Sequence, residues 1–320
     1  AAPEYVLPLF ALAMLTTIII VLGGISGGIE KATRIMMPLL FVLLIVIIIR
    51  SLTLPGSGAG VEYYLVPDFS KITGGVVLKA LTQAFFSLGI GWGIIITYGS
   101  YLPKDQSIVS SSLWVGAMDT SVALLGGLMV FPAVFAFGME PGSGPTLVFE
   151  VLANIFPSMP FGNIAGAFFY LLLFIAAITS TISMVEVVGS WLIDDKRWTR
   201  KKATWTVGIA AFVVGIPSAL SNGTSPTLTN LQFMGAHGML DIMDFLFGTM
   251  AMLIVVFTTC LYTGWAIKTD RIIDEISLGS PYFNTKKVLG ILPSTLWKFF
   301  IRVICPLVII LVISNQIGIF

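Results

Sequence analysis

The sequence predicts an all-α, polytopic membrane protein that crosses the bilayer about eight times. Apolar residues make up 57% of its 320 residues, and charged residues only 10%. The mean hydropathy of +0.99 means more apolar surface than a soluble domain of this length can bury. Long apolar stretches also recur along the whole chain. Helices are the structure expected there, because the backbone inside a bilayer must satisfy its own hydrogen bonds.

Each expected crossing is an apolar stretch close to the length of about 20 residues that a membrane helix needs. In chain order the stretches are Tyr5 to Leu22, Ile35 to Leu54, Val76 to Tyr101, Ile108 to Phe137, Phe161 to Ile193, Ala203 to Leu220, Phe245 to Ile267 and Phe299 to Ile319. The connections leave no room for a soluble domain. We therefore expect one transmembrane domain over residues 1–320.

The basic residues predict which ends of the spans face the cytoplasm, because Lys and Arg accumulate in cytoplasmic loops. Of the 17 basic residues, only Arg50, Lys71 and Lys79 lie toward the other side. The remaining ones fall in alternate connections, among them the cluster at residues 196–202. This alternation agrees with eight crossings and places both ends of the chain outside.

Composition and motifs argue against several classes of protein. A net charge of +1 without a basic stripe disfavours nucleic acid as a partner. Cys260 and Cys305 lie in apolar stretches without a second Cys or His nearby, which predicts packing residues. Hydrolytic motifs and phosphate loops are lacking. Asp119 and Asp244 do not resemble an intramembrane aspartyl protease pair, since one lies inside a span and the other at an outer end. We expect no enzyme.

The third span contains alternate glycines, at positions 89, 91 and 93. Alternate glycines loosen a helix and expose its backbone. One interpretation is close helix packing through small residues. The other is a discontinuous helix whose two halves direct their dipole ends and freed carbonyls at a binding site near the midplane. In the second case Phe86 and Trp92 supply apolar walls, and Ser87 supplies a hydroxyl.

Polar residues inside other spans also suggest a site. Asp119 has no basic residue within a turn, so it is either a functional carboxylate suited to sodium or a protonated packing residue. Thr179 and Ser180 either bond back to the preceding turn or offer two oxygens to one ion. Glu186 lies about two turns farther along, where it could line an inner path. Asp244 opens the seventh span, where capping is an equally good account.

Several short motifs follow one another in a fixed order along the chain. They are Gly27-Gly-Ile-Glu-Lys31, Ile35-Met-Met-Pro-Leu39, Phe85-Phe-Ser-Leu-Gly89, Thr97-Tyr-Gly-Ser-Tyr101, Lys104-Asp-Gln106 and Ala177-Ile-Thr-Ser-Thr-Ile182. Together they resemble the neurotransmitter:sodium symporter family, bacterial amino-acid branch. The resemblance implies a leucine-transporter-like fold, truncated at its N-terminus. Residues 1–75 resemble the last two helices of the first inverted repeat, 76–267 the second repeat, and 268–320 the eleventh helix and its preceding loop.

The resemblance also implies roles for individual residues. Substrate-binding positions are Phe86, Ser87, Gly89, Trp92, Ser180 and Met184. Ligands of a first sodium ion are Ser87 and Asp119, and those of a second are Ala176, through its carbonyl, Thr179 and Ser180. Gate residues are Tyr101 and Asp194 on the inner side and Asp244 on the outer side. Asp119 stands where many members have asparagine, and its charge implies that chloride is not required.

The function implied is sodium-coupled symport of an amino acid by alternating access in a cell membrane, expected to be the bacterial inner membrane. The apolar pocket positions favour an apolar or aromatic substrate. The family's first three helices have no counterpart here, so we expect these 320 residues not to transport alone. Two other interpretations are a non-transporting remnant or membrane assembly subunit, and a cation channel. The channel lacks support, because the chain has no repeated acidic motif or filter ring.

Overall fold

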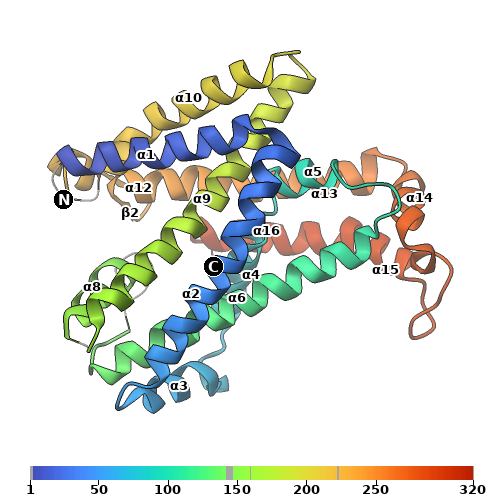
Figure 1. Ribbon diagram of the computed structural model, residues 1–320. Helices are drawn as coiled ribbons and strands as arrows, with labels where there is room; N and C mark the ends of the chain where they lie inside the picture. Colours follow the sequence, from blue (N-terminus) through green and yellow to red (C-terminus); the bar gives the residue numbers. More distant parts are fainter. Residues whose placement is uncertain (1–2, 142–146, 159, 222, 320) are drawn as a thin grey trace. The chain divides into compact units, whose positions relative to one another are not determined.

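The computed structural model describes residues 3–141, 147–158, 160–221 and 223–319. Nearly all of the regular structure in these ranges is helical (Figure 1). The strands β1 (Gln232–Phe233) and β2 (Ala236–His237) form a short antiparallel pair with Gln232 opposite His237. The all-α fold class is therefore confirmed.

Seven helical runs in the described part of the chain are long and apolar enough to cross a membrane. Uniform or nearly uniform runs are α1 (Pro3–Leu22), η1 (Ile25–Ile29) with α2 (Glu30–Leu52), α6 (Ile108–Ala136), α9 (Gly162–Asp194) and α10 (Arg200–Leu220). Two runs contain wider turns: α12 (Gly238–Met243), η5 (Asp244–Ala251), α13 (Met252–Leu261) and η6 (Tyr262–Ala266), and then α15 (Pro293–Phe299), η8 (Phe300–Ile304) and α16 (Cys305–Gln316). The remaining predicted span is divided into α4 (Gly74–Ser87) and α5 (Ile94–Gly99).

Three runs begin six or more residues earlier than hydropathy predicted, at Ile25, Gly238 and Pro293. Hydropathy finds only the apolar part of a helix, whereas polar first turns and a proline at the first helical position are also compatible with helix. Asp244 therefore lies six residues inside its run, counted from Gly238. The prediction that Asp244 opens the seventh span, and with it the capping alternative, is wrong.

Shorter elements form the connections. They are α3 (Ser57–Leu65), η2 (Phe69–Lys71), η3 (Leu147–Val151), α8 (Leu152–Ile155), η4 (Phe156–Ser158), α11 (Pro226–Thr229), α14 (Thr269–Gly279) and η7 (Pro281–Phe283).

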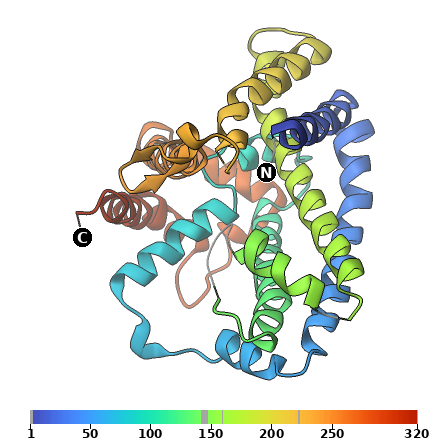
Figure 2. The same ribbon diagram turned by 90° about the vertical axis from the view of Figure 1, so that its left-hand side faces the viewer.

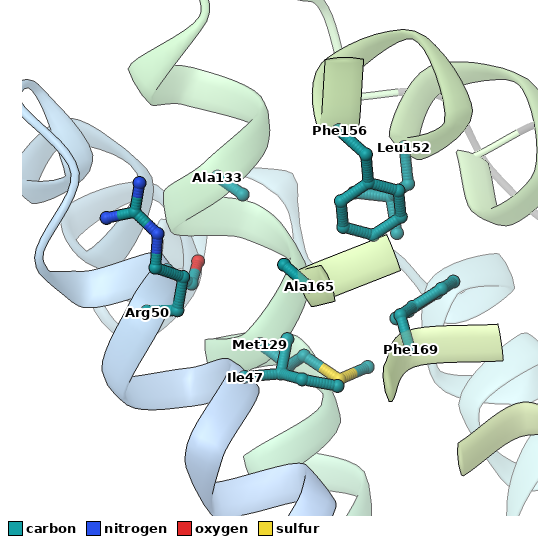
Figure 3. Close-up of a pocket in the computed structure, with 9 residues that line it drawn as sticks. Ile47, Arg50, Met129, Ala133, Leu152, Phe156, Ala165 and Phe169 are labelled. Carbon is teal, nitrogen blue, oxygen red and sulfur yellow. The ribbon is translucent and has the colours of Figure 1, made fainter. Parts of the chain in front are cut away.

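The chain forms two compact units. Unit 1 contains Ala1–Leu15, Ile72–Ala117 and Glu186–Phe320, and unit 2 contains Thr16–Lys71 and Met118–Val185. In unit 1, α16 packs against α13 around buried Leu253 and Ile309. These two helices, orange and red in Figure 2, lie side by side. In unit 2, side chains of α2, α6 and α9 form one apolar core, part of which Figure 3 shows. These cores supply the rigid elements on which the predicted site residues lie.

The start of α1 packs beside α10 within unit 1 (Figure 1). The ring centroids of Phe10 and Phe212 are 5.0 Å apart. A Cβ atom at Gly215 would lie 2.7 Å from the Phe10 ring, so glycine allows this close approach. This contact ties the first apolar stretch of the chain to the sixth.

Candidate functional site

The third predicted span is broken over residues 88–93, between α4 and α5. Gly89, Gly91 and Gly93 have φ angles of 66°, 93° and 78°, in the left-handed region that favours glycine. The Leu88 N–H still donates to the Ala84 carbonyl at 3.1 Å, and helix resumes where the Thr97 N–H donates to the Gly93 carbonyl at 2.9 Å. The structure thus has the discontinuous helix that the glycine spacing indicated.

Close packing through small residues occurs at the same break. A Cβ atom at Gly91 would lie 2.7 Å from both the Met252 carbonyl oxygen and Val256 Cγ2 of α13. A Cβ atom at Gly93 would lie 2.9 Å from Val187 Cγ1. The glycines therefore serve both interpretations, because they permit the backbone turn and let α13 approach it.

Four predicted substrate-binding residues lie at this break. Phe86 and Ser87 end α4, and Gly89 and Trp92 lie in the interruption. The Phe86 and Trp92 rings meet edge to face, with centroids 5.8 Å apart and planes at 84°. This is a favoured geometry for two aromatic rings. The segment therefore joins an aromatic pair and a hydroxyl to backbone that is not helical.

The predicted second sodium site forms one turn of α9. Thr179 Oγ1 donates to the Ala176 carbonyl at 2.8 Å, and Ser180 Oγ does so at 3.3 Å. The hydroxyls thus bond back to the preceding turn, as is usual in apolar helices. The turn nevertheless gathers three oxygens, the ligand type that hard cations prefer. Met184 lies one turn farther along, on the same face as Ser180.

The two predicted ligands of the first sodium ion lie on different elements. Asp119 is half-buried in the first half of α6, in unit 2, and Ser87 ends α4, in unit 1. Their sharing of one ion stays a prediction. Among the described residues, no group of three His, Cys, Asp or Glu side chains is arranged to hold a metal ion. A sodium site here would depend on carbonyl and hydroxyl oxygens together with Asp119.

Tyr101, one of the predicted inner-gate residues, belongs to a buried charged network in unit 1. Its hydroxyl donates to Glu186 Oε1 at 2.9 Å. Arg200 Nη1 and Nη2 donate to Glu186 Oε2 and Oε1 at 2.8 and 3.0 Å. The Glu186 residue is fully buried, so these three charge-assisted hydrogen bonds balance a carboxylate that would otherwise be costly to bury. Asp194, the other predicted inner-gate residue, interacts electrostatically with Arg200.

Sequence reasoning placed Glu186 near an inner path but missed Arg200 as its partner. A tight turn joins α9 to α10, with Arg197 at a φ of 57° and the Trp198 N–H donating to the Leu192 carbonyl at 3.1 Å. This turn reverses the chain and brings the first residue of α10 back to Glu186. A lone carboxylate about two turns before the end of α9, followed by a helix that starts with basic residues, was the available signal.

Asp244, the predicted outer-gate acid, is exposed at the first residue of the wide-turn segment η5. Its carboxylate lies over Gly248, since a Cβ atom there would be 2.5 Å from Asp244 Oδ1. Wide helical turns of this kind are frequent at functional sites. The gating role of Asp244 stays a prediction.

Comparison with known proteins gives a consistent result. The model of the sodium:neurotransmitter symporter family matches residues 5–320. The sodium-dependent transporter YhdH of Bacillus subtilis is 39% identical over 306 residues, which cover 96% of this chain and 65% of that protein. A sodium-dependent transporter of Haemophilus influenzae is 34% identical over 306 residues, 95% of this chain and 64% of that protein. The chain thus spans just under two thirds of the length of these relatives.

A solved structure agrees with the sequence relatives. The crystal structure of MhsT in complex with L-phenylalanine matches with a TM-score of 0.82 and 38% identity, covering 96% of this chain and 67% of that one. The relatives are transporters and not enzymes, and the apolar helices make this a multi-pass protein of a cell membrane. The chain belongs to the sodium:neurotransmitter symporter family.

Proposed function

We propose that the protein is a sodium-coupled symporter of an amino acid that works by alternating access. The observation that carries this proposal is the break between α4 and α5, with the Phe86 and Trp92 rings in contact across it. The ends of two half-helices and their freed backbone groups bind a zwitterion without a charged side chain. The family membership of the chain supports coupling to sodium.

The substrate in this proposal is an apolar or aromatic amino acid. Aromatic walls at the break favour an apolar side chain, and a Cβ atom at Gly89 would meet nothing closer than Ile94 Cδ1 at 3.8 Å. Space at position 89 therefore suits a bulky substrate. The solved structure of MhsT contains L-phenylalanine, which supports the same class.

Sodium binds, in this proposal, at two groups of oxygens. The first comprises Ser87 and Asp119, and the second comprises the Ala176 carbonyl with the Thr179 and Ser180 hydroxyls. The hydrogen bonds that the Thr179 and Ser180 hydroxyls donate to the Ala176 carbonyl support the second group, because they hold the three oxygens close together. Chloride is not required, since the Asp119 carboxylate supplies a fixed negative charge.

The Tyr101, Glu186 and Arg200 network closes the inner path, with Asp194 nearby. Breaking a buried ion pair by removing one partner costs about 3–5 kcal/mol, so separating these groups without hydration carries a large barrier. A ligand shifts such an equilibrium only through its different affinities for the two states. Sodium should therefore tighten amino-acid binding, and the amino acid should tighten sodium binding by the same factor.

Binding of labelled phenylalanine to the full-length protein, measured by scintillation proximity in sodium and in choline, tests the proposal. Sodium should tighten binding by about 5- to 150-fold, the usual range for coupling between two sites. Thr179→Val should weaken the sodium effect. The matched control is Thr258→Val, which removes an exposed hydroxyl that bonds back to Ile254 on α13. Equal affinity in both salts would contradict the proposal.

A further inference from the structure

The connection between α14 and α15 in unit 1 contains a short hairpin at residues 286–291 (Figure 1). The Val288 N–H donates to the Ile291 carbonyl at 2.9 Å, and the Ile291 N–H donates to the Val288 carbonyl at 3.1 Å. Leu289 and Gly290, with φ angles of 51° and 84°, form the turn between them. A two-residue type I′ turn requires positive φ at both of these positions.

Leucine is an unfavourable residue at the first position of this turn. Asn, Asp or Gly is preferred there, because a bulky side chain is strained at positive φ. Leu289 is nevertheless 98% exposed, more than any other large apolar residue in the described ranges. Neither turn preference nor packing within the described chain accounts for a leucine here. Backbone strain of this kind is concentrated at functional sites.

The side chains beside Leu289 are apolar or basic. Val288 and Ile291 are both exposed, although they lie in a connection and not on a membrane-spanning run. Lys286 and Lys287 precede them and are exposed as well. The sequence has no Asp or Glu between residues 276 and 292. The hairpin therefore combines an apolar tip with two positive charges and no acidic neighbour in sequence.

The hairpin is within reach of the membrane surface. The run that begins at Pro293 has 24 residues, a length of about 36 Å, against about 30 Å for the hydrocarbon core. Pro293 therefore lies near the surface, and Leu289, four residues earlier, lies at most about 14 Å from it. The base of the connection is fixed, since buried Ser294 donates to Asn284 Oδ1 at 2.7 Å. Basic residues predict that this side is cytoplasmic.

The residue types favour a lipid surface over a protein partner. Exposed aliphatic side chains beside lysines are typical of segments that lie in the membrane interface, whereas lysine is depleted in protein–protein interfaces. Exposed Tyr282, whose ring centroid is 5.7 Å from Lys286 Nζ, is of a residue type enriched at membrane interfaces. We propose that the hairpin inserts Leu289 into the cytoplasmic leaflet and that its two lysines bind the headgroups of anionic phospholipids.

A nitroxide spin label at Leu289→Cys tests this proposal in full-length protein whose other cysteines are replaced by alanine. The protein is placed in nanodiscs of phosphatidylethanolamine and phosphatidylglycerol, and collisions of the label with oxygen and with a water-soluble nickel chelate are measured. The label should collide with oxygen and be protected from nickel. Arg271→Cys, on the exposed face of α14 in the same connection, is the control and should collide freely with nickel.

Two further variants separate the apolar tip from the charges. Replacing Lys286 and Lys287 by Gln should weaken insertion by about 30-fold, because each lysine near an anionic surface contributes about fivefold. A label at Ile291→Cys should lose its protection when Leu289→Asn is added, although Asn suits the turn better than Leu.

Each part of the proposal has an outcome that overturns it. Free collision with nickel at position 289 would mean that water surrounds the tip. Protection from both oxygen and nickel would mean that another part of the protein, or a second copy, covers it. Protection that persists in the lysine variant would exclude anionic headgroups, and protection of the Ile291→Cys label that persists with Leu289→Asn would exclude insertion of the leucine.

Discussion

At the scale of single residues, Glu186 is the charged residue that is buried in the described part of the chain. It is fully buried and accepts hydrogen bonds from Tyr101 and from both terminal nitrogens of Arg200. We expect Glu186→Ala to destabilise the protein by about 3–5 kcal/mol, because it leaves the Arg200 charge without its partner. A lowered midpoint of thermal unfolding in detergent would show this.

The matched control for Glu186 is the exposed ion pair between Asp195 and Lys196, in which Lys196 Nζ lies 2.8 Å from Asp195 Oδ2. Asp195→Asn should change stability by no more than about 1 kcal/mol, since water screens this pair. Similar midpoints for the Glu186 and Asp195 variants would show that the buried network is not the stabilising one.

Gly91 is the second residue at which a substitution should have a clear effect on stability. Its φ of 93° and the 2.7 Å approach of a Cβ atom to the Met252 carbonyl oxygen both oppose a side chain. Gly91→Ala should lower the midpoint of thermal unfolding and weaken phenylalanine binding, because α13 must move away from the break. Gly99→Ala, where a Cβ atom would meet nothing within 4 Å, is the control. Equal effects of the two substitutions would contradict the packing described for Gly91.

At the scale of helices, Arg302 joins three elements at one end of unit 1. Its Nε donates to the Gly264 carbonyl at the end of η6, and its Nη2 donates to Thr269 Oγ1 at the start of α14, both at 2.7 Å. Lysine cannot reproduce this planar pair of donors. Arg302→Lys should therefore lower the unfolding midpoint by several degrees, whereas Arg271→Lys on the exposed face of α14 should leave it unchanged. Unchanged midpoints for both would show that Arg302 does not hold these elements together.

The helices show what sequence patterns can and cannot predict. Apolar length predicted each membrane-spanning run, and the glycine spacing predicted the break, because both depend on local residue type. The predicted start of the seventh span, at Phe245, was wrong, since the helix begins at Gly238, before the apolar stretch. The pairing of Glu186 with Arg200 was missed because it depends on how the turn between α9 and α10 reverses the chain. The sharing of ions between Ser87 and Asp119 stays a prediction for the same reason: it depends on long-range geometry.

At the scale of the whole molecule, Asp119 predicts how transport depends on anions. If its carboxylate supplies the negative charge beside the first sodium ion, replacing chloride by gluconate should leave the initial rate of amino-acid uptake unchanged. Asp119→Asn should make uptake depend on chloride. Uptake that collapses in gluconate would contradict the role given to Asp119.

The most direct test of sodium-coupled symport uses the full-length protein in sealed liposomes. Labelled phenylalanine uptake is measured with an inward sodium gradient, with equal sodium on both sides, and with choline in place of sodium. We predict accumulation above the external concentration only with the inward gradient, and its collapse when a sodium ionophore is added. Equal uptake under all three conditions, or accumulation that survives the ionophore, would contradict the account.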